Sequence, residues 1–422
     1  MKKNVKASYL NDFKCIGGVC EDNCCIGWNV EIDKKTYAKY EKIKDKELTK
    51  YFKKYIYKND VSYDKNVDYA LVELEANKHC PFLNQEKLCR IQAELGENYL
   101  SNVCSSYPRL INEVDGILEY SATISCPEIA RLALGAKDGI EFKQKNAGNV
   151  EDNIINIIVN TKKEDSPLLV KYLQELRGLT MGILKSRDYT LWERMLIIGI
   201  VFRKIQELIN LNKAEEIPGQ IVMFSQKVDH RGFQREVKPL PINQSAQLEI
   251  LKEISDKFND SNEIDSERYL SFIYEFYKGI GAGKKSVKKE SRSAALKQSN
   301  AELSNRYNVL YKDFYKPFMD EKDYILENYL VNFVFQSLFP MTENNQPFES
   351  YTNLVIRYSL IKFNLIGISG FRNGLTETLV IEFIQSFSKG LEHNYNFFEK
   401  IGEYIQQKNY DTMEYMSILI RN

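Results

Sequence analysis

The eight cysteines of this 422-residue chain all fall within its first 126 positions. A random scatter would give such a distribution with a probability below about 1 in 10,000. Four of them lie in one short stretch, as Cys15, Cys20, Cys24 and Cys25, and the others are Cys80, Cys89, Cys104 and Cys126. The clustering indicates a disulfide framework, a metal site or a redox site, with eight buried thiols acting as small apolar side chains as the alternative.

The expected compartment favours a metal or redox site over disulfides. The first 14 residues, MKKNVKASYLNDFK, contain lysines but no apolar segment of a secretory signal. We therefore expect a cytoplasmic protein, whose thiols stay reduced. No run of 18 or more apolar residues is present, so the sequence predicts no membrane span.

The cysteine spacing does not choose between an iron–sulfur cluster and zinc. Zinc knuckles usually come as two separate pairs, whereas Cys15-x4-Cys20 and Cys20-x3-Cys24 share Cys20. The later spacings are wide, as expected for thiolates that come from several loops and helices. As metal ligands we rank first the cysteines of the two densest motifs, and then the remaining four. The first group is Cys20, Cys24, Cys80 and Cys89, and the second is Cys15, Cys25, Cys104 and Cys126.

Periodicity beyond the cysteines predicts helices. Lysine-rich amphipathic spacing favours a helix or helix pair over 33–57, and 69–74 has the length and composition of a short strand. Helical spacing recurs over 191–211, 246–258, 269–277, 323–338, 351–365 and 376–391. The sequence thus predicts a mainly α protein with a cysteine-rich metal-binding domain (1–140) and a larger all-helical domain (141–422) that binds a partner or substrate.

Charge and glycine patterns narrow the possible ligands. Lys+Arg and Asp+Glu number 58 each, so the chain lacks the net positive charge typical of nucleic-acid binding. The run Gly279–Ser286 (GIGAGKKS) departs from the P-loop at two positions, and we interpret it as a basic loop, with a phosphate or cofactor contact as the alternative. No alternation of strands and helices favours the common cofactor-binding sheet.

Five strings resemble the bacterial flagellin lysine-N-methylases. They are FKCIGGVCEDNCCIGWNVEIDKKTYAKY (Phe13–Tyr40), HCPFLNQEKLCRIQAELGENYLSNVCSSYPR (His79–Arg109), SATISCPEIARLAL (Ser121–Leu134), KPFMDEKDYILENYLVNFVFQSLFP (Lys316–Pro340) and IQSFSKGLEHN (Ile384–Asn394). The resemblance implies methyl transfer from S-adenosylmethionine to lysines of flagellin, with a four-iron, four-sulfur (4Fe-4S) cluster. Whether the transfer is polar or radical stays open. The C-x3-C-x2-C motif that is usual for radical chemistry is absent, because Cys20-x3-Cys24 is followed directly by Cys25.

Two other functions remain compatible with the residues. One is an iron–sulfur redox protein that uses the cluster or the Cys24–Cys25 pair, and the other is a metal-stabilised scaffold that binds a protein without catalysis. The sequence assigns no catalytic residue and no residue that binds the methyl donor.

Overall fold

The computed structural model describes residues 3–28, 30–146, 155–258, 264, 266–282, 300–342 and 345–422. The strands are β1 (Lys3–Ala7), β2 (Val30–Ile32), β3 (Ile56–Lys58), β4 (Ala70–Val72), β5 (Arg109–Val114), β6 (Ile117–Ala122), β7 (Phe142–Asn146) and β8 (Ile157–Val159). The helices up to Asp229 are α1 (Lys34–Tyr40), α2 (Lys46–Tyr55), α3 (Arg90–Leu95), α4 (Asn102–Ser106), α5 (Pro127–Leu134), α6 (Leu168–Lys171), α7 (Leu173–Lys185), α8 (Leu191–Asn210) and α9 (Ile217–Asp229). The later helices are α10 (Gln234–Val237), α11 (Gln244–Phe258), α12 (Glu267–Ile280), α13 (Asn300–Leu310), α14 (Lys316–Lys322), α15 (Tyr324–Gln336), α16 (Pro347–Arg372), α17 (Glu377–Phe387), α18 (Tyr395–Gln407) and α19 (Met413–Ile420).

A small lobe, residues 15–107, contains helices α1 to α4 and the antiparallel sheet β2-β4-β3. Its first two helices begin where carboxylates cap them: Asp33 accepts a hydrogen bond from the Thr36 N–H, and Asp45 accepts one from the Leu48 N–H. The lobe has its own core, in which Tyr40 stacks on Phe52 at 4.4 Å between ring centroids. The predicted helix pair and the predicted strand, observed as β4, are confirmed here.

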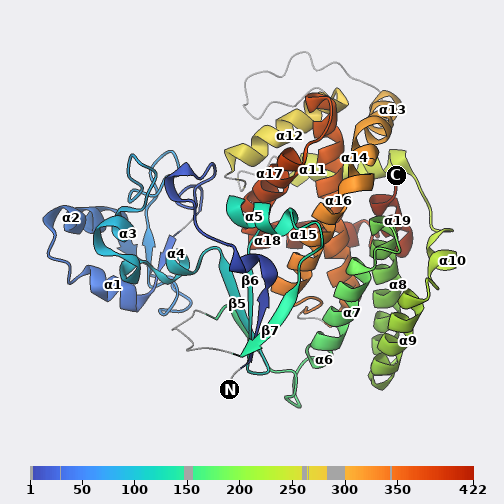
Figure 1. Ribbon diagram of the computed structural model, residues 1–422, viewed down its shortest axis with the longest axis horizontal. Coiled ribbons are helices and arrows are strands. Elements are labelled where there is room, and N and C mark those ends of the chain that lie inside the picture. Colours follow the sequence, from blue (N-terminus) through green and yellow to red (C-terminus); the bar gives the residue numbers. More distant parts are fainter. Residues whose placement is uncertain are drawn as a thin grey trace.

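A five-stranded mixed sheet, in the order β7-β1-β6-β5-β8, lies between the lobe and the helices (Figure 1). Strands β5 and β6 form a hairpin through Asp115 and Gly116, both of which have positive φ, as a two-residue turn of type I′ requires. The sheet is fixed to α15 by Tyr9, whose hydroxyl accepts from the Ala122 N–H at 2.8 Å and donates to Asn332 Oδ1 at 2.6 Å.

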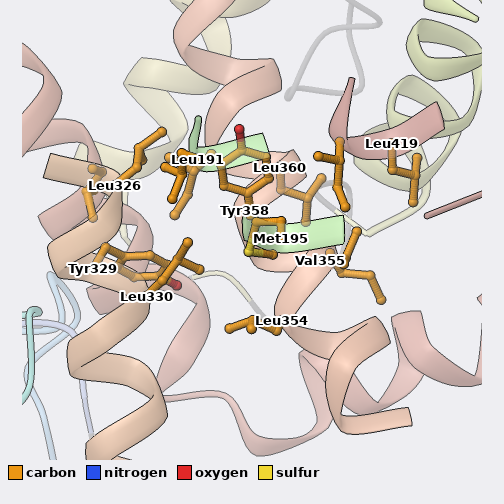
Figure 2. Packing of buried hydrophobic residues seen from close by; sticks show 14 of the residues in the cluster. Leu191, Met195, Leu326, Tyr329, Leu330, Leu354, Val355, Tyr358, Leu360 and Leu419 are labelled. Carbon is orange, nitrogen blue, oxygen red and sulfur yellow. The ribbon is translucent and has the colours of Figure 1, made fainter. Parts of the chain in front are cut away.

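The helical body surrounds α16, which packs against α8, α12 and α19. Figure 2 shows part of this core, where Leu191 and Met195 of α8 meet Val355 and Tyr358 of α16. Within the described residues, α16 is the one helix long and apolar enough to cross a membrane, and 83% of its apolar window is buried in the body. Its composition therefore matches its place in the core.

Glycine permits the close crossing of α12 and α16. A Cβ atom at Gly279 would lie 1.8 Å from the backbone oxygen of Gly367, and one at Gly367 would lie 2.2 Å from the ring of Phe276. Gly281 then ends α12 in the left-handed conformation. The first two glycines of the run 279–286 thus have structural roles, and positions 283–286 of that run lie outside the described residues.

The prediction of a mainly α protein is confirmed. The part after residue 140 is not all-helical, however, because β7 and β8 from that part extend the sheet at its two edges. The isoleucine-rich run 154–159, which contains β8, left a strand and a helix open, whereas β7 was missed because, like β1, it finds its partner far away in the chain. Tyr9 and the buried face of α5 share the large core with the helical body, whereas the lobe has a separate core. The domain boundary at residue 140 stays a prediction.

Candidate functional site

All eight cysteines line two adjoining cavities at the edge of the small lobe. The smaller cavity, of about 90 Å³, is lined by Cys24, Cys25, Cys80, Cys89 and Cys104. The wider one, of about 200 Å³, is lined by Cys15, Cys20, Cys24, Cys25, Cys89, Cys104 and Cys126. Four cysteines thus belong to both cavities. The fold gathers thiols that are as many as 111 positions apart (126 minus 15).

The N-terminal ends of two helices position two of these thiols. Cys89 precedes α3 and Cys126 precedes α5, whose first residue, Pro127, suits a helix start. Burial raises the pKa of the Cys126 thiol to about 12, and the backbone N–H groups of Ile129 and Glu128 oppose this rise. Both thiols therefore sit where a thiolate would find N–H donors.

Adjacent Cys24 and Cys25 form a hydrogen-bonded pair, and their pKa values are shifted in opposite directions. The hydrogen bond from Cys25 lowers the pKa of Cys24 to about 7, with a smaller contribution from the positive charge of Lys389. The same hydrogen bond and burial raise the pKa of Cys25. Cys24 is therefore the thiol of this pair that ionises first.

The number and kind of these donors suit a metal centre, because thiolates are the ligands of iron–sulfur clusters and of many zinc sites. Within the described ranges, however, no group of three or more His, Cys, Asp or Glu side chains is arranged to hold a metal ion. The ranking of cysteine ligands made from the sequence therefore stays a prediction.

The helical body contacts the loop that carries Cys20 and Cys24, the cysteine loop. The contacts come from Gln385 of α17 and from Lys389 of the π-helical turn Ser388–Glu392 that follows it. Lys389 forms an ion pair with Asp22 and also donates to the backbone oxygen of Asn23 at 3.1 Å. Gln385 donates to the same carboxylate at 2.8 Å. The side chains of Lys389 and Asp22 are only 12% and 14% exposed. We call Asp22, Gln385 and Lys389 the latch.

Aromatic side chains add further contacts between the cysteine-rich part and the helical body. The ring of Trp28 lies 4.7 Å from that of Tyr107 and 5.1 Å from that of His393, and its indole N–H donates to the backbone oxygen of Cys24. Ser125 Oγ lies 2.8 Å from His393 Nε2 and 3.2 Å from the Tyr107 hydroxyl. Burial lowers the pKa of His393 and raises that of Tyr107, so both are neutral at neutral pH.

Sequence reasoning assigned no role to the latch or to His393. A signal existed, because Gln385, Lys389 and His393 recur every four residues in the string Ile384–Asn394, and this spacing places them on one helical face. That string and the cysteine string Phe13–Tyr40, nearly 350 positions apart, meet in the latch.

Comparison with known proteins identifies the family. The family described as FliB lysine N-methylase C-terminal domain matches residues 177–419, more than half of the chain. The chain is 31% identical over 139 residues to the lysine-N-methylases of Salmonella choleraesuis and Salmonella typhimurium, which is 33% of this chain and 34% of each of those proteins. It is also 31% identical over 143 residues to the flagellar biosynthetic protein FliU of Salmonella muenchen, which is 33% of this chain and 82% of that protein.

The match therefore spans about a third of the length of the two curated lysine-N-methylases. No solved structure matches the chain. The family match covers α8 to α18, which form most of the helical body, as well as the latch residues of α17 and the turn after it. The chain belongs to the FliB lysine N-methylase family.

Proposed function

We propose that this protein transfers methyl groups from S-adenosylmethionine to lysine side chains of flagellin, and that the N-terminal cysteines hold a metal centre. Membership of a lysine N-methylase family carries this proposal. The flagellin substrate is suggested by the name of the relative FliU, a flagellar biosynthetic protein. A cytoplasmic location fits this proposal, since flagellin and the methyl donor meet inside the cell.

The reaction requires a neutral amine aligned with the methyl group. The S–CH₃ bond of the sulfonium breaks as the N–CH₃ bond forms, the sulfur becomes a thioether, and the amine loses one proton. Glu97 and Glu128 line the wider cavity. Because Glu128 is paired with Arg131 at 2.8 Å, Glu97 is the carboxylate available to bind the lysine ammonium and accept its proton. Arg109, which lines the same cavity, is the cation suited to the carboxylate of the donor.

The cysteines that line the two cavities would hold the metal centre; of these, Cys80 lines the smaller cavity alone and Cys126 the wider one alone. A 4Fe-4S cluster with one iron free of thiolate would supply a site for the amino and carboxylate groups of the donor. Zinc is the alternative metal. The latch would keep the cysteine loop closed against the body, and neutral Tyr107 would donate a hydrogen bond into the cavities.

The experiment is anaerobic purification of the full chain followed by incubation with flagellin and S-adenosylmethionine. We expect brown protein with about four iron and four sulfide ions per chain. Mass spectrometry of flagellin peptides should show lysines heavier by whole methyl groups. Replacing Cys80 or Cys89 with serine should release iron, and a Glu164→Gln variant, changed on an exposed loop, should retain it.

The outcomes separate the possible functions. Colourless, zinc-containing protein that still methylates flagellin would contradict the iron–sulfur centre but not the methylase. Unmodified flagellin lysines, together with a redox-active spectrum and no binding of S-adenosylmethionine by calorimetry, would contradict the methylase. That result would favour the redox function, for which the hydrogen-bonded Cys24–Cys25 pair is the observation.

A further inference from the structure

The small lobe, residues 15–107, is packed against the helical body far less than each of them is packed within itself. The lobe has its own core, and within the described residues none of its helices or strands is extensively packed against a helix or strand of the body. Figure 1 shows the lobe, with α1 to α4, projecting from one side of the body. Loop side chains join the two, through contacts such as that of Trp28 with His393. The lobe is therefore able to move as one unit.

The two chain connections between the lobe and the body lie side by side. Phe13 stands two residues before the lobe and Arg109 two residues after it, and the Arg109 guanidinium carbon lies 5.5 Å from the centre of the Phe13 ring. Hinges are typically a few residues in loops or at the ends of elements. Phe13 lies outside the helices and strands, and Arg109 is the first residue of β5. Because the two connections are adjacent, the lobe can rotate about them while few backbone dihedral angles change.

The latch joins the lobe to the body at a second place. Asp22 belongs to the lobe, whereas Gln385 and Lys389 belong to the body. Glu21 and Arg131 form another ion pair across this boundary, at 2.6 Å, but both of its side chains are a third or more exposed, so it contributes little. The Asp22–Lys389 pair is largely buried. Loss of either partner would leave the other charge buried and unpaired, so the latch favours the closed position of the lobe.

The wider cysteine cavity is bounded by both of these places. Its lining includes the two chain connections, Phe13 and Arg109, and also Asp22 of the latch. The body contributes Pro127 to its wall, and the lobe contributes Gln92. Separation of the lobe from the body at the latch would therefore widen this cavity.

The cysteine cavities are small for the reactants of the proposed function. Cavities that enclose small ligands typically measure about 300–1,000 Å³. The cysteine cavities measure about 200 Å³ and about 90 Å³. Methyl transfer requires the donor and a lysine side chain in the site together. The closed arrangement thus leaves too little room for both, and the site must open before they enter.

We propose that the small lobe is a hinged lid, which rotates about Phe13 and Arg109 when the latch separates and so admits the reactants to the cysteine cavities. The identity of the reactants rests on the proposed function. The movement itself is a property of the chain and is measured without them.

Double electron–electron resonance on the anaerobically purified full chain measures the movement. The eight cysteines exclude thiol labels, so nitroxides are attached to p-acetylphenylalanine introduced at the exposed positions 85 and 271. Gln85 lies two residues before Lys87, whose backbone oxygen accepts from the side chain of Asn23, next to the latch. Ser271 lies on α12, three residues after Arg268, which contacts the latch. The distance between the labels therefore spans the latch and lengthens when the lobe opens.

Variants of the ion pairs shift the balance between the closed and open positions. Lys389→Gln should raise the ratio of the longer to the shorter distance at least about tenfold. Arg131→Gln added to Lys389→Gln removes both ion pairs that the described residues form between lobe and body, and the longer distance should then predominate. Lys316→Gln breaks an ion pair within α14 instead and should leave the distances as in the parent. Far-UV circular dichroism checks that each variant is folded.

A second pair of labels, at position 271 and at the exposed Lys213 of the body, should keep one distance in every variant. A single, unchanged distance between positions 85 and 271 in the double variant would refute the lid. A shift of the body pair, or a shift in Lys316→Gln equal to that in Lys389→Gln, would also overturn it. Neither donor nor flagellin is present in these measurements, so failure here is distinguishable from failure of the methylase proposal.

Discussion

Replacing Gly279 with alanine tests whether this glycine serves helix packing or a ligand. The added Cβ would lie 1.8 Å from the Gly367 oxygen, 2.8 Å from the Gly367 carbonyl carbon and 2.9 Å from the Phe371 nitrogen. All three are backbone atoms, which cannot rotate away as a side chain does. Helix α12 must therefore move back from α16, its most extensive contact in the fold.

Overpacking of a core typically costs about 1–3 kcal/mol, and backbone collisions fall at the upper end or beyond. Alanine has a higher helix propensity than glycine, which offsets this loss of stability by about 1 kcal/mol. We expect a net loss of about 2–3 kcal/mol in the free energy of unfolding, measured by urea denaturation and far-UV circular dichroism.

Gly182→Ala is the matched control. Gly182 lies exposed within α7, and a Cβ there would meet nothing within 4 Å. This substitution should stabilise the protein by about 0.5–1 kcal/mol. If Gly279→Ala were as stable as the control, the packing explanation would be wrong, and a ligand contact of the run 279–286 would become the better explanation.

Two further predictions concern buried charges. In the latch, Asp22→Asn and Lys389→Gln should each destabilise the protein, and a double-mutant cycle by urea denaturation should give a coupling of about 1–3 kcal/mol; additive effects would contradict a direct pair. Burial lowers the pKa of Lys362 from 10.5 to about 7, while its ammonium nitrogen donates to the Ile420 oxygen at 2.7 Å. Between those two values unfolded Lys362 binds a proton that folded Lys362 does not, so the contribution of this lysine to stability should rise with pH from about 7 towards 10.5. Lys362→Met should flatten this rise in urea denaturation measured across that range, and an unchanged pH dependence would refute the assignment.

Much of the fold was predictable because helices have local signals. The spacing over 191–211 predicts a helix within a residue of the observed α8. Strand β1 had no comparable signal, because it pairs with residues of β6 and β7 more than 110 positions away. The Asp115–Gly116 turn was one local signal, and it was missed.

The candidate site divides in the same way. Eight cysteines in the first third of the chain indicated a shared centre, and the structure places all eight around two adjoining cavities. Which of them bind a metal stays a prediction, because that depends on distances between thiols. The contact of the cysteine loop with Gln385 and Lys389 was not predicted, because the positions of Asp22 and Lys389 in the sequence do not indicate that they lie close together.

The sequence by itself determined the class of the protein, mainly helical, and the collection of thiols in its N-terminal part. Both could be predicted because they depend on residue types and on spacings of a few residues, that is, on interactions within one or two helical turns. Only the tertiary structure decided that the latch joins Asp22 to Lys389 and that Gly279 lies against Gly367. These contacts join segments far apart in the chain, and they form because α12, α16 and α17 pack around one core.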